Sequence, residues 1–246
     1  MNILDQHIVA MTSPIHYATK HNHINVVRLL LEHGANVNSL NGGTTPLHIA
    51  SYNGNTNINS LLLDYDANLT IYNKAGHLAI HMAVKNIDVF QQLLDGGADI
   101  NAMTSNGGSM LTVAICNNAP IVTINLILSK GVDVNNIDNM SCTPLHVASS
   151  FNNMEAAKLL LKHGADINLN VQVNNVNISP IDMGLAKNSR GQDVANMLRT
   201  MINEQSSSRF FLLLSRIAKI VAIGFICPSI SQIEAPTICG DRHGSS

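Results

Sequence analysis

The sequence predicts an all-α solenoid, a stack of similar helix-turn-helix units, because two phrases recur in alternation. The first phrase is Ser/Thr-Pro-Leu/Ile-His, as in TPLHIA at 45–50 and TPLHVA at 143–148. The second is leucine-rich and ends in Gly-Ala, as in LLLEHGANVN at 29–38 and LLLKHGADIN at 159–168. The second residue of the first phrase falls at positions 14, 46, 79, 110, 144 and 180. Such a period is typical of repeat proteins, whose units bury their apolar faces against one another.

The first phrase predicts the start of a short helix. In Thr45-Pro46 and Thr143-Pro144 the threonine hydroxyl can cap free amides of the first turn, while proline has no amide hydrogen that needs a partner. Ser13-Pro14 and Ser179-Pro180 offer the same pair. A small residue four positions after proline lets a neighbouring helix approach closely, and it recurs in three units: Ala18, Ala50 and Ala148.

The second phrase predicts a second helix after a turn. Its apolar residues have helical spacing, as Ile24, Val27 and Leu31 show in the first unit. An alternating stretch then leads to an extended turn such as 41–43. Glycines that can adopt a left-handed backbone are expected to end four of these helices: Gly34, Gly97, Gly131 and Gly164. In the second unit Asp66 takes that place.

The two phrases at a period near 33 residues resemble the ankyrin repeat. The resemblance covers residues 11–205. It implies stacked helix pairs with β-hairpin-like fingers that project at roughly a right angle, and a concave face made by the fingers and the first helices. It also implies that the histidines of the first phrase bond to backbone between units: His16, His48, His81 and His146. The predicted repeats are 11–40, 43–72, 76–105, 107–138, 141–170 and 177–205, with residues 1–10 as an N-terminal cap.

Two interior repeats depart from the pattern. The third has Ala79 instead of proline and lacks two residues in the turn near 86–87. The fourth has Thr112 instead of histidine and one extra residue near 119–120, where Pro120 is predicted to start the second helix. Because the short and long repeats adjoin, we expect the stack to be least regular between residues 76 and 138.

The last repeat is expected to be degenerate. Asp182 and Gly184 occupy motif positions, and the finger before them, residues 169–178, is long and rich in Asn and Val. Repeat arrays need an atypical terminal unit to cover the open edge of the core. The sequence therefore predicts that residues 177–205 close the array.

Signatures of catalysis and of metal binding are missing from the sequence. It contains no glycine-rich phosphate loop, no GxSxG and no HExxH. His77 and His81 have the spacing of metal ligands on a helix, but His77 precedes the predicted helix start, so we expect the two not to share a helical face. We therefore expect no catalytic residue, cofactor or metal; an enzyme would need a deep pocket with a perturbed cluster of titratable residues.

The composition restricts the partner and the compartment. The formal charge of −2 provides no basic surplus for nucleic acid. The four cysteines lack CxxC spacing, which favours free thiols in a reducing compartment, and we expect Cys116 to be buried. The N-terminus lacks the pattern of a signal peptide. We expect a monomer in the cytoplasm.

Protein binding is then the expected function, through variable positions of the concave face and fingertips. Aromatic residues dominate interface energetics, which favours Tyr52, Tyr72 and Phe151. The candidate partner-binding residues are Lys20, His21, Tyr52, Asn53, Tyr72, Lys74, Lys85, Met103, Asn117, Asp138, Met140 and Phe151. Leu40, Asn118 and Ser150 hold equivalent positions.

The C-terminal tail, residues 206–246, does not continue the repeat. Its apolar run at 210–227 predicts a helix near the lower length limit of a membrane span. Arg216 and Lys219 lie near the middle, where each would cost about 2.5–3.5 kcal/mol in a bilayer. Three interpretations stay open: a cap on the last repeat, membrane association, and docking to a separate protein. The alternative function is accordingly a membrane-tethered adaptor, which could also be an effector directed at a host.

Overall fold

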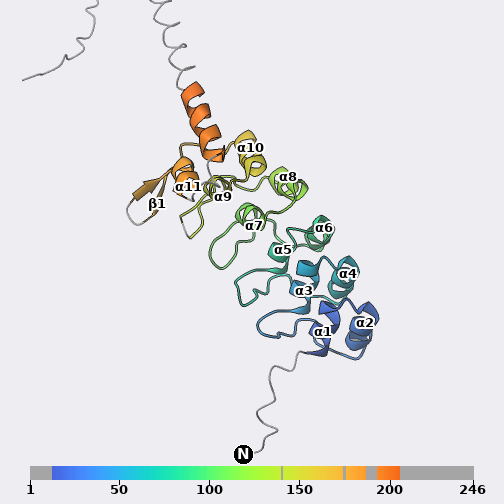
Figure 1. Ribbon diagram of the computed structural model, residues 1–246. Helices are drawn as coiled ribbons and strands as arrows, with labels where there is room; N and C mark the ends of the chain where they lie inside the picture. Colours follow the sequence, from blue (N-terminus) through green and yellow to red (C-terminus); the bar gives the residue numbers. More distant parts are fainter. Residues whose placement is uncertain (1–12, 140, 174–175, 187–192, 206–246) are drawn as a thin grey trace, which may run out of the picture. The chain divides into compact units, whose positions relative to one another are not determined.

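The computed structural model describes residues 13–139, 141–173, 176–186 and 193–205, which are mostly helical (Figure 1). The predicted N-terminal cap, Met140 and the predicted helix at 210–227 lie outside these residues. The chain divides after Leu198 into two compact units, and the fold and the site below belong to the first, residues 1–198.

The first five predicted repeats each contain two helices. The first helices of these pairs, here called inner helices, are α1 (Pro14–Lys20), α3 (Pro46–Asn53), α5 (Ala79–Met82), α7 (Met110–Cys116) and α9 (Pro144–Ser150). The second helices, here called outer helices, are α2 (Ile24–Glu32), α4 (Thr56–Asp64), α6 (Ile87–Asp95), α8 (Ile121–Ser129) and α10 (Met154–Lys162). Figure 1 shows the inner helices in one row and the outer helices in a second row.

A hairpin leads into the last predicted repeat. Strand β1 (Val171–Val173) pairs antiparallel with β2 (Val176–Ile178), and α11 (Pro180–Ala186) packs against α9. A further helical stretch covers residues 193–205. The predicted all-α solenoid with hairpin-like fingers is confirmed. Within the described part of the chain, no helix combines the length and the apolarity that a bilayer span requires.

The inner helices begin largely as the sequence predicts. Thr45, Ser109 and Thr143 each accept a hydrogen bond from the backbone amide three residues later, at 3.3–3.4 Å. The expected cap at Ser13 is wrong, because its backbone has φ −49° instead of about −90° and its side chain makes no capping bond. The expected helix start at Pro120 is displaced, since Pro120 is the cap residue and α8 begins one residue later.

The third repeat shows the effect of its two missing residues. Helix α5 has four residues, whereas the other inner helices among the described pairs have seven or eight. The turn from Ala83 to Asn86 then leads directly into α6. The deletion therefore shortens the inner helix as well as the turn.

The core lies between the two rows of helices. The small residue four positions after the first residue of each inner helix is buried, with at most 2% of its surface exposed: Ala18, Ala50, Ala83, Ala114 and Ala148. One position near the end of the outer helices is fully buried in four repeats: Leu62, Leu93, Ile127 and Leu160. Each of these large side chains contributes about 1.5–3 kcal/mol relative to an exposed position.

Left-handed residues end the outer helices at the expected places. Gly34, Gly97, Gly131 and Gly164 have φ between +76° and +93°. Asp66, which replaces glycine in the second repeat, adopts φ +56°. This conformation is costly for a residue with a Cβ, although Asp tolerates it better than most.

Four buried histidines connect successive repeats. Their Nε2 atoms donate to carbonyl oxygens of the next finger: His16 to Thr44 at 2.8 Å, His48 to His77 at 3.0 Å, His81 to Ala102 at 3.1 Å and His146 to Ile178 at 3.1 Å. The Nδ1 atom of His81 accepts from the Leu78 amide at 3.0 Å. One nitrogen must donate and the other must accept, so the neutral tautomer with its hydrogen on Nε2 fits the site. These histidines have the structural role that the resemblance implies.

The histidine bridges predict a loss of stability in mild acid. Burial lowers the pKa of His81 to about 4, although its bond to Ala102 acts in the opposite direction. An unfolded histidine has a pKa of about 6.5, so the unfolded chain binds more protons between pH 6.5 and 4. The unfolding free energy is therefore highest above pH 6.5 and falls as the pH falls, by roughly 3 kcal/mol for His81 alone.

Urea unfolding measured at pH 7.5, 6.5, 5.5 and 4.5 checks this expectation. His81→Gln keeps a donor near the Ala102 carbonyl but cannot titrate, so its stability should depend less on pH than that of the unaltered chain. Equal pH dependence of the two chains would contradict the assignment.

Candidate partner-binding groove

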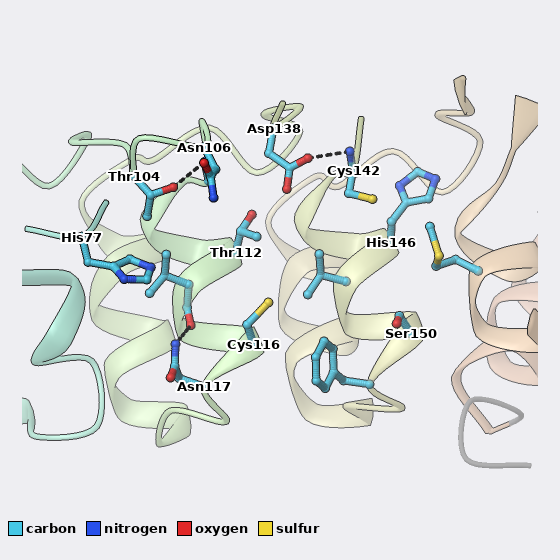
Figure 2. A pocket seen from close by; sticks show the side chains of 15 residues that line it. His77, Thr104, Asn106, Thr112, Cys116, Asn117, Asp138, Cys142, His146 and Ser150 are labelled. Atoms are coloured by element: carbon cyan, nitrogen blue, oxygen red, sulfur yellow. Dashed lines mark hydrogen bonds between the residues drawn. The ribbon is translucent and has the colours of Figure 1, made fainter. Parts of the chain in front are cut away.

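The inner helices and fingers enclose two adjoining hollows. The larger has a volume of about 500 Å³ and extends from the finger that contains His77 to Met183 of α11. Figure 2 shows that side chains of α7 and α9 face this hollow, with finger residues above them. The smaller hollow, of about 130 Å³, lies at Tyr52, Met82 and Lys85 and shares the wall residues His77, Val113 and Asn117 with the larger one. We call the two together the groove.

Small side chains on the inner helices create the larger hollow. The seventh position of each inner helix, or the position equivalent to it, carries in order Lys20, Tyr52, Lys85, Cys116 and Ser150. The side chain at this position is thus smaller in α7 and α9 than in the preceding repeats. The side chain at the fourth position also becomes smaller along the array, from Tyr17 and Ile49 through Met82 to Val113 and Val147. The floor of the groove is therefore lower at α7 and α9 than at α1 and α3.

The missing histidine of the fourth repeat opens the same region. The Oγ1 atom of Thr112 lies 3.2 Å from the Ser109 hydroxyl in its own cap. In three other repeats the imidazole reaches the carbonyl just before the next helix cap, and the equivalent residue here is Cys142. Threonine is too short for that bridge. Thr112 and Cys142 both line the larger hollow.

Two thiols face the larger hollow. Cys116 is exposed, so the expectation of burial is wrong, because the seventh helix position points away from the helix interface that buries Ala114 and Ile115. Cys142 is half-buried, and burial, Asp138 and Cys116 together raise the pKa of its thiol. The Oδ1 atom of Asp138 accepts the Cys142 amide hydrogen at 2.8 Å, which fixes the finger above the groove. With its raised pKa the Cys142 thiol stays uncharged near neutral pH, which suits an apolar ligand.

Burial favours the neutral form of the histidines at the groove. Burial lowers the pKa of His77, of His81 and of His146. His77 precedes α5, as expected, so it shares no helical face with His81, yet the finger brings the two rings to 6.0 Å from each other. The described residues contain no group of three or more side chains that could hold a metal ion.

The structure places the candidate residues on the inner surface with different roles. Ten of them are exposed: Lys20, His21, Tyr52, Asn53, Tyr72, Lys74, Lys85, Met103, Asn117 and Phe151. Asp138 is half-buried, and Met140 lies outside the described residues. Five of the eleven that the structure describes line the groove, and four of these are exposed: Tyr52, Lys85, Asn117 and Phe151. Asp138 also lines it, with one carboxylate oxygen bonded to its own finger.

Several candidates are partly engaged in the array itself. The Tyr72 hydroxyl donates to the Met103 carbonyl at 3.1 Å and so links two fingers. The Asn53 amide donates to the Lys20 carbonyl at 3.4 Å, and the Asn117 amide to the Val113 carbonyl at 2.9 Å. These residues present a fixed surface, which lowers the entropy cost of binding.

Sequence reasoning missed much of the groove floor. Thr112, Val113, Cys116, Cys142 and Val147 line the larger hollow but are not among the candidates that the sequence suggests. A comparison of equivalent helix positions across the repeats could have indicated the hollow. At the seventh position of the inner helices the side-chain volume falls from Lys20 and Tyr52 to Cys116 and Ser150.

Comparison with known proteins identifies the family. A family model of ankyrin repeats in three copies matches residues 1–73 and 77–171. The chain belongs to the ankyrin-repeat family. Members of this family are general protein–protein interaction modules and are typically non-enzymatic scaffolds.

Individual relatives come from viruses and animals. A putative ankyrin repeat protein of Fowlpox virus (strain NVSL) is 35% identical over 159 residues, which cover 59% of this chain and 46% of that protein. A second putative ankyrin repeat protein of the same virus is 33% identical over 203 residues, or 81% of this chain and 38% of that protein. Neurogenic locus notch homolog protein 2 of Homo sapiens is 28% identical over 129 residues, 38% of this chain and 5% of that protein. These matches thus cover less than half of each relative.

The two groove thiols should differ in reactivity. Thiolate is the reactive form, so the exposed Cys116 is expected to react with N-ethylmaleimide at pH 7.5 several-fold faster than Cys142, whose pKa is raised. Peptide mass mapping of the full chain after timed labelling measures both rates, with Cys116→Ser as the control for the assignment of peptides. Faster labelling of Cys142 would contradict the described geometry.

Proposed function

We propose that this chain is a non-enzymatic binding module that holds a segment of a partner protein in the groove between its inner helices and fingers. The observation that carries the proposal is the pair of adjoining hollows that extends from Tyr52 to Met183, with the exposed aromatic residues Tyr52 and Phe151 in their walls. A site of about 500 Å³ has the size of side-chain and small-ligand pockets. Membership of a family of interaction modules supports the same conclusion.

We further propose that the chain acts as a monomer in a reducing cytosol. Cys116 and Cys142 face the same hollow as thiols. Thiols at this place would be exposed to oxidation outside a reducing compartment. The cytoplasmic location is therefore part of the proposal.

A second candidate function is a membrane-tethered adaptor. It depends on the apolar run at 210–227, whose basic residues Arg216 and Lys219 also suit a helix on a membrane surface. In that case the repeats would bind the same kind of partner, but near a bilayer.

Loss of the exposed aromatic residues should weaken binding. The full chain is used as bait, its partner is identified by mass spectrometry, and the affinity of the purified pair is measured by calorimetry. The triple variant Tyr52→Ala, Tyr72→Ala and Phe151→Ala is expected to bind at least tenfold more weakly, because aromatic residues contribute disproportionately to interfaces.

The matched control is Tyr65→Ala, which removes an exposed tyrosine at the end of the outer helix α4. Its affinity should equal that of the unaltered chain. Undiminished binding by the triple variant, with its circular dichroism spectrum and unfolding midpoint retained, would exclude the groove as the binding site.

A further inference from the structure

We propose that the groove takes an extended, acidic segment of a partner protein that also carries one large apolar side chain. The acidic residues lie over the first three repeats, and the apolar side chain enters the hollow between α7 and α9. This inference depends on the proposed function and specifies the chemistry of the bound segment and its placement along the groove.

Charge is segregated in the first three repeats. Their inner helices and fingers, residues 13–23, 39–55 and 71–86, contain three lysines and no Asp or Glu. These lysines are Lys20, Lys74 and Lys85, and all three are exposed. The acidic residues of the same repeats lie on the outer helices or in the stretch that follows them: Glu32, Asp64, Asp66, Asp88, Asp95 and Asp99.

This segregation gives the inner side a positive potential that the net charge of −2 conceals. Arg28 is the one lysine or arginine on the outer side between residues 13 and 103. Complementary charge steers association and selects against the wrong partner more than it raises affinity. An acidic segment is therefore favoured on the inner side, and it would be repelled by the outer side.

The character of the inner side changes at the fourth repeat. Its inner helix and the turns around it, residues 104–120, carry no Asp, Glu, Lys or Arg. In the equivalent part of the fifth repeat, residues 137–153, Asp138 is the single such residue. The larger hollow at this place is lined largely by apolar groups, among them Val113, Val147 and Phe151. This hollow can bury one large aliphatic or aromatic side chain.

The repeat geometry relates the two parts of the ligand. Lys85 lies at the smaller hollow, which shares His77, Val113 and Asn117 with the larger one. Packed helices lie about 8–10 Å apart, so the centre between α7 and α9 is roughly 12–15 Å from the Lys85 position. An extended chain advances about 3.3 Å per residue. An acidic residue opposite Lys85 and the apolar side chain are therefore about four or five residues apart.

Protein is a better match than nucleic acid. Three lysines are spread over three repeats, whereas a nucleic-acid site needs a dense basic stripe to follow successive phosphates. The Asp138 carboxylate at the edge of the larger hollow would repel a phosphate there. An acidic peptide with an apolar anchor meets neither difficulty.

The test selects ligands directly, so the partner need not be identified first. A phage library of random twelve-residue peptides is panned against the full chain, and the most enriched peptide is made with a fluorescein label for anisotropy titrations. We expect enriched peptides to combine two or more Asp or Glu residues with a large apolar residue four or five positions away.

Three variants of the full chain locate the binding. Reversal of the inner charges by Lys20→Glu, Lys74→Glu and Lys85→Glu should weaken binding at least tenfold at 50 mM salt, and less at 500 mM, because salt screens exposed charges. The matched control reverses three exposed charges of outer helices, Arg28→Glu, Lys158→Glu and Lys162→Glu, and should leave affinity within about twofold. Cys116→Phe, which occupies part of the larger hollow without adding charge, should also weaken binding about tenfold.

The outcomes separate the two proposals. If the selected peptides lack the acidic and apolar pairing, but the triple aromatic variant still abolishes their binding, the inference fails and the proposed function stands. If no peptide is enriched, or if every inner-side variant binds as well as the unaltered chain, both fail. A fluorescein-labelled 20-nucleotide single strand that binds more tightly than the peptide at the same salt, and loses affinity on charge reversal, overturns the inference in favour of nucleic acid.

Discussion

The hydrogen bond from a buried imidazole to the next finger is the interaction on which this array depends. Each of the four histidines lies on an inner helix and donates through Nε2 to a carbonyl oxygen of the next finger. In His48, His81 and His146 the Nδ1 atom also contacts the cap residue of the same helix. The bond is formed inside the structure, where an unpaired carbonyl would be costly. It therefore ties each of these fingers to the inner helix of the preceding repeat.

The larger hollow of the groove lies where this bridging system is interrupted. Thr112 cannot span to the next finger, and the side chains at Val113, Cys116, Val147 and Ser150 are too small to fill the space that follows. The hollow thus arises from two changes in one region, a missing bridge and a lowered floor. Lys20, Lys74 and Lys85 add positive charge to the inner side of the three repeats that precede the larger hollow. Stability and binding are therefore linked through the same inner helices.

The sequence was sufficient to predict most of the fold. The two phrases placed most helix starts and the left-handed helix ends, because each depends on a local rule of capping or backbone conformation. The histidine bridges were implied by the resemblance to the ankyrin repeat, since they join residues far apart in the sequence. The exceptions also have local causes. Ser13 fails to cap since its backbone angle differs from that of Thr45 and Thr143. Helix α5 is shorter than the turn deletion alone suggested.

The groove was predicted less well than the fold because small side chains, and not large or charged ones, form its larger hollow. Motif matching directs attention to large or charged residues such as Tyr72 and Lys74, which stand out in a sequence. A hollow is made by small residues such as Cys116 and Ser150, which stand out only when equivalent positions of several repeats are compared. The exposure of Cys116 has the same origin, since its helix position faces the hollow instead of the neighbouring helix.

The unfolding free energy of Thr112→His tests the central claim most directly. We expect histidine at this position to reach the Cys142 carbonyl. That carbonyl accepts the Asp138 amide hydrogen. The Thr44 and His77 carbonyls likewise accept an amide hydrogen of their own finger in addition to the imidazole hydrogen. Urea titration at pH 7.5 should show stabilisation by about 1 kcal/mol, whereas Thr112→Asn, which is too short to bridge, should show none. A destabilised or unchanged Thr112→His chain would contradict the view that the array depends on the imidazole bridge between repeats.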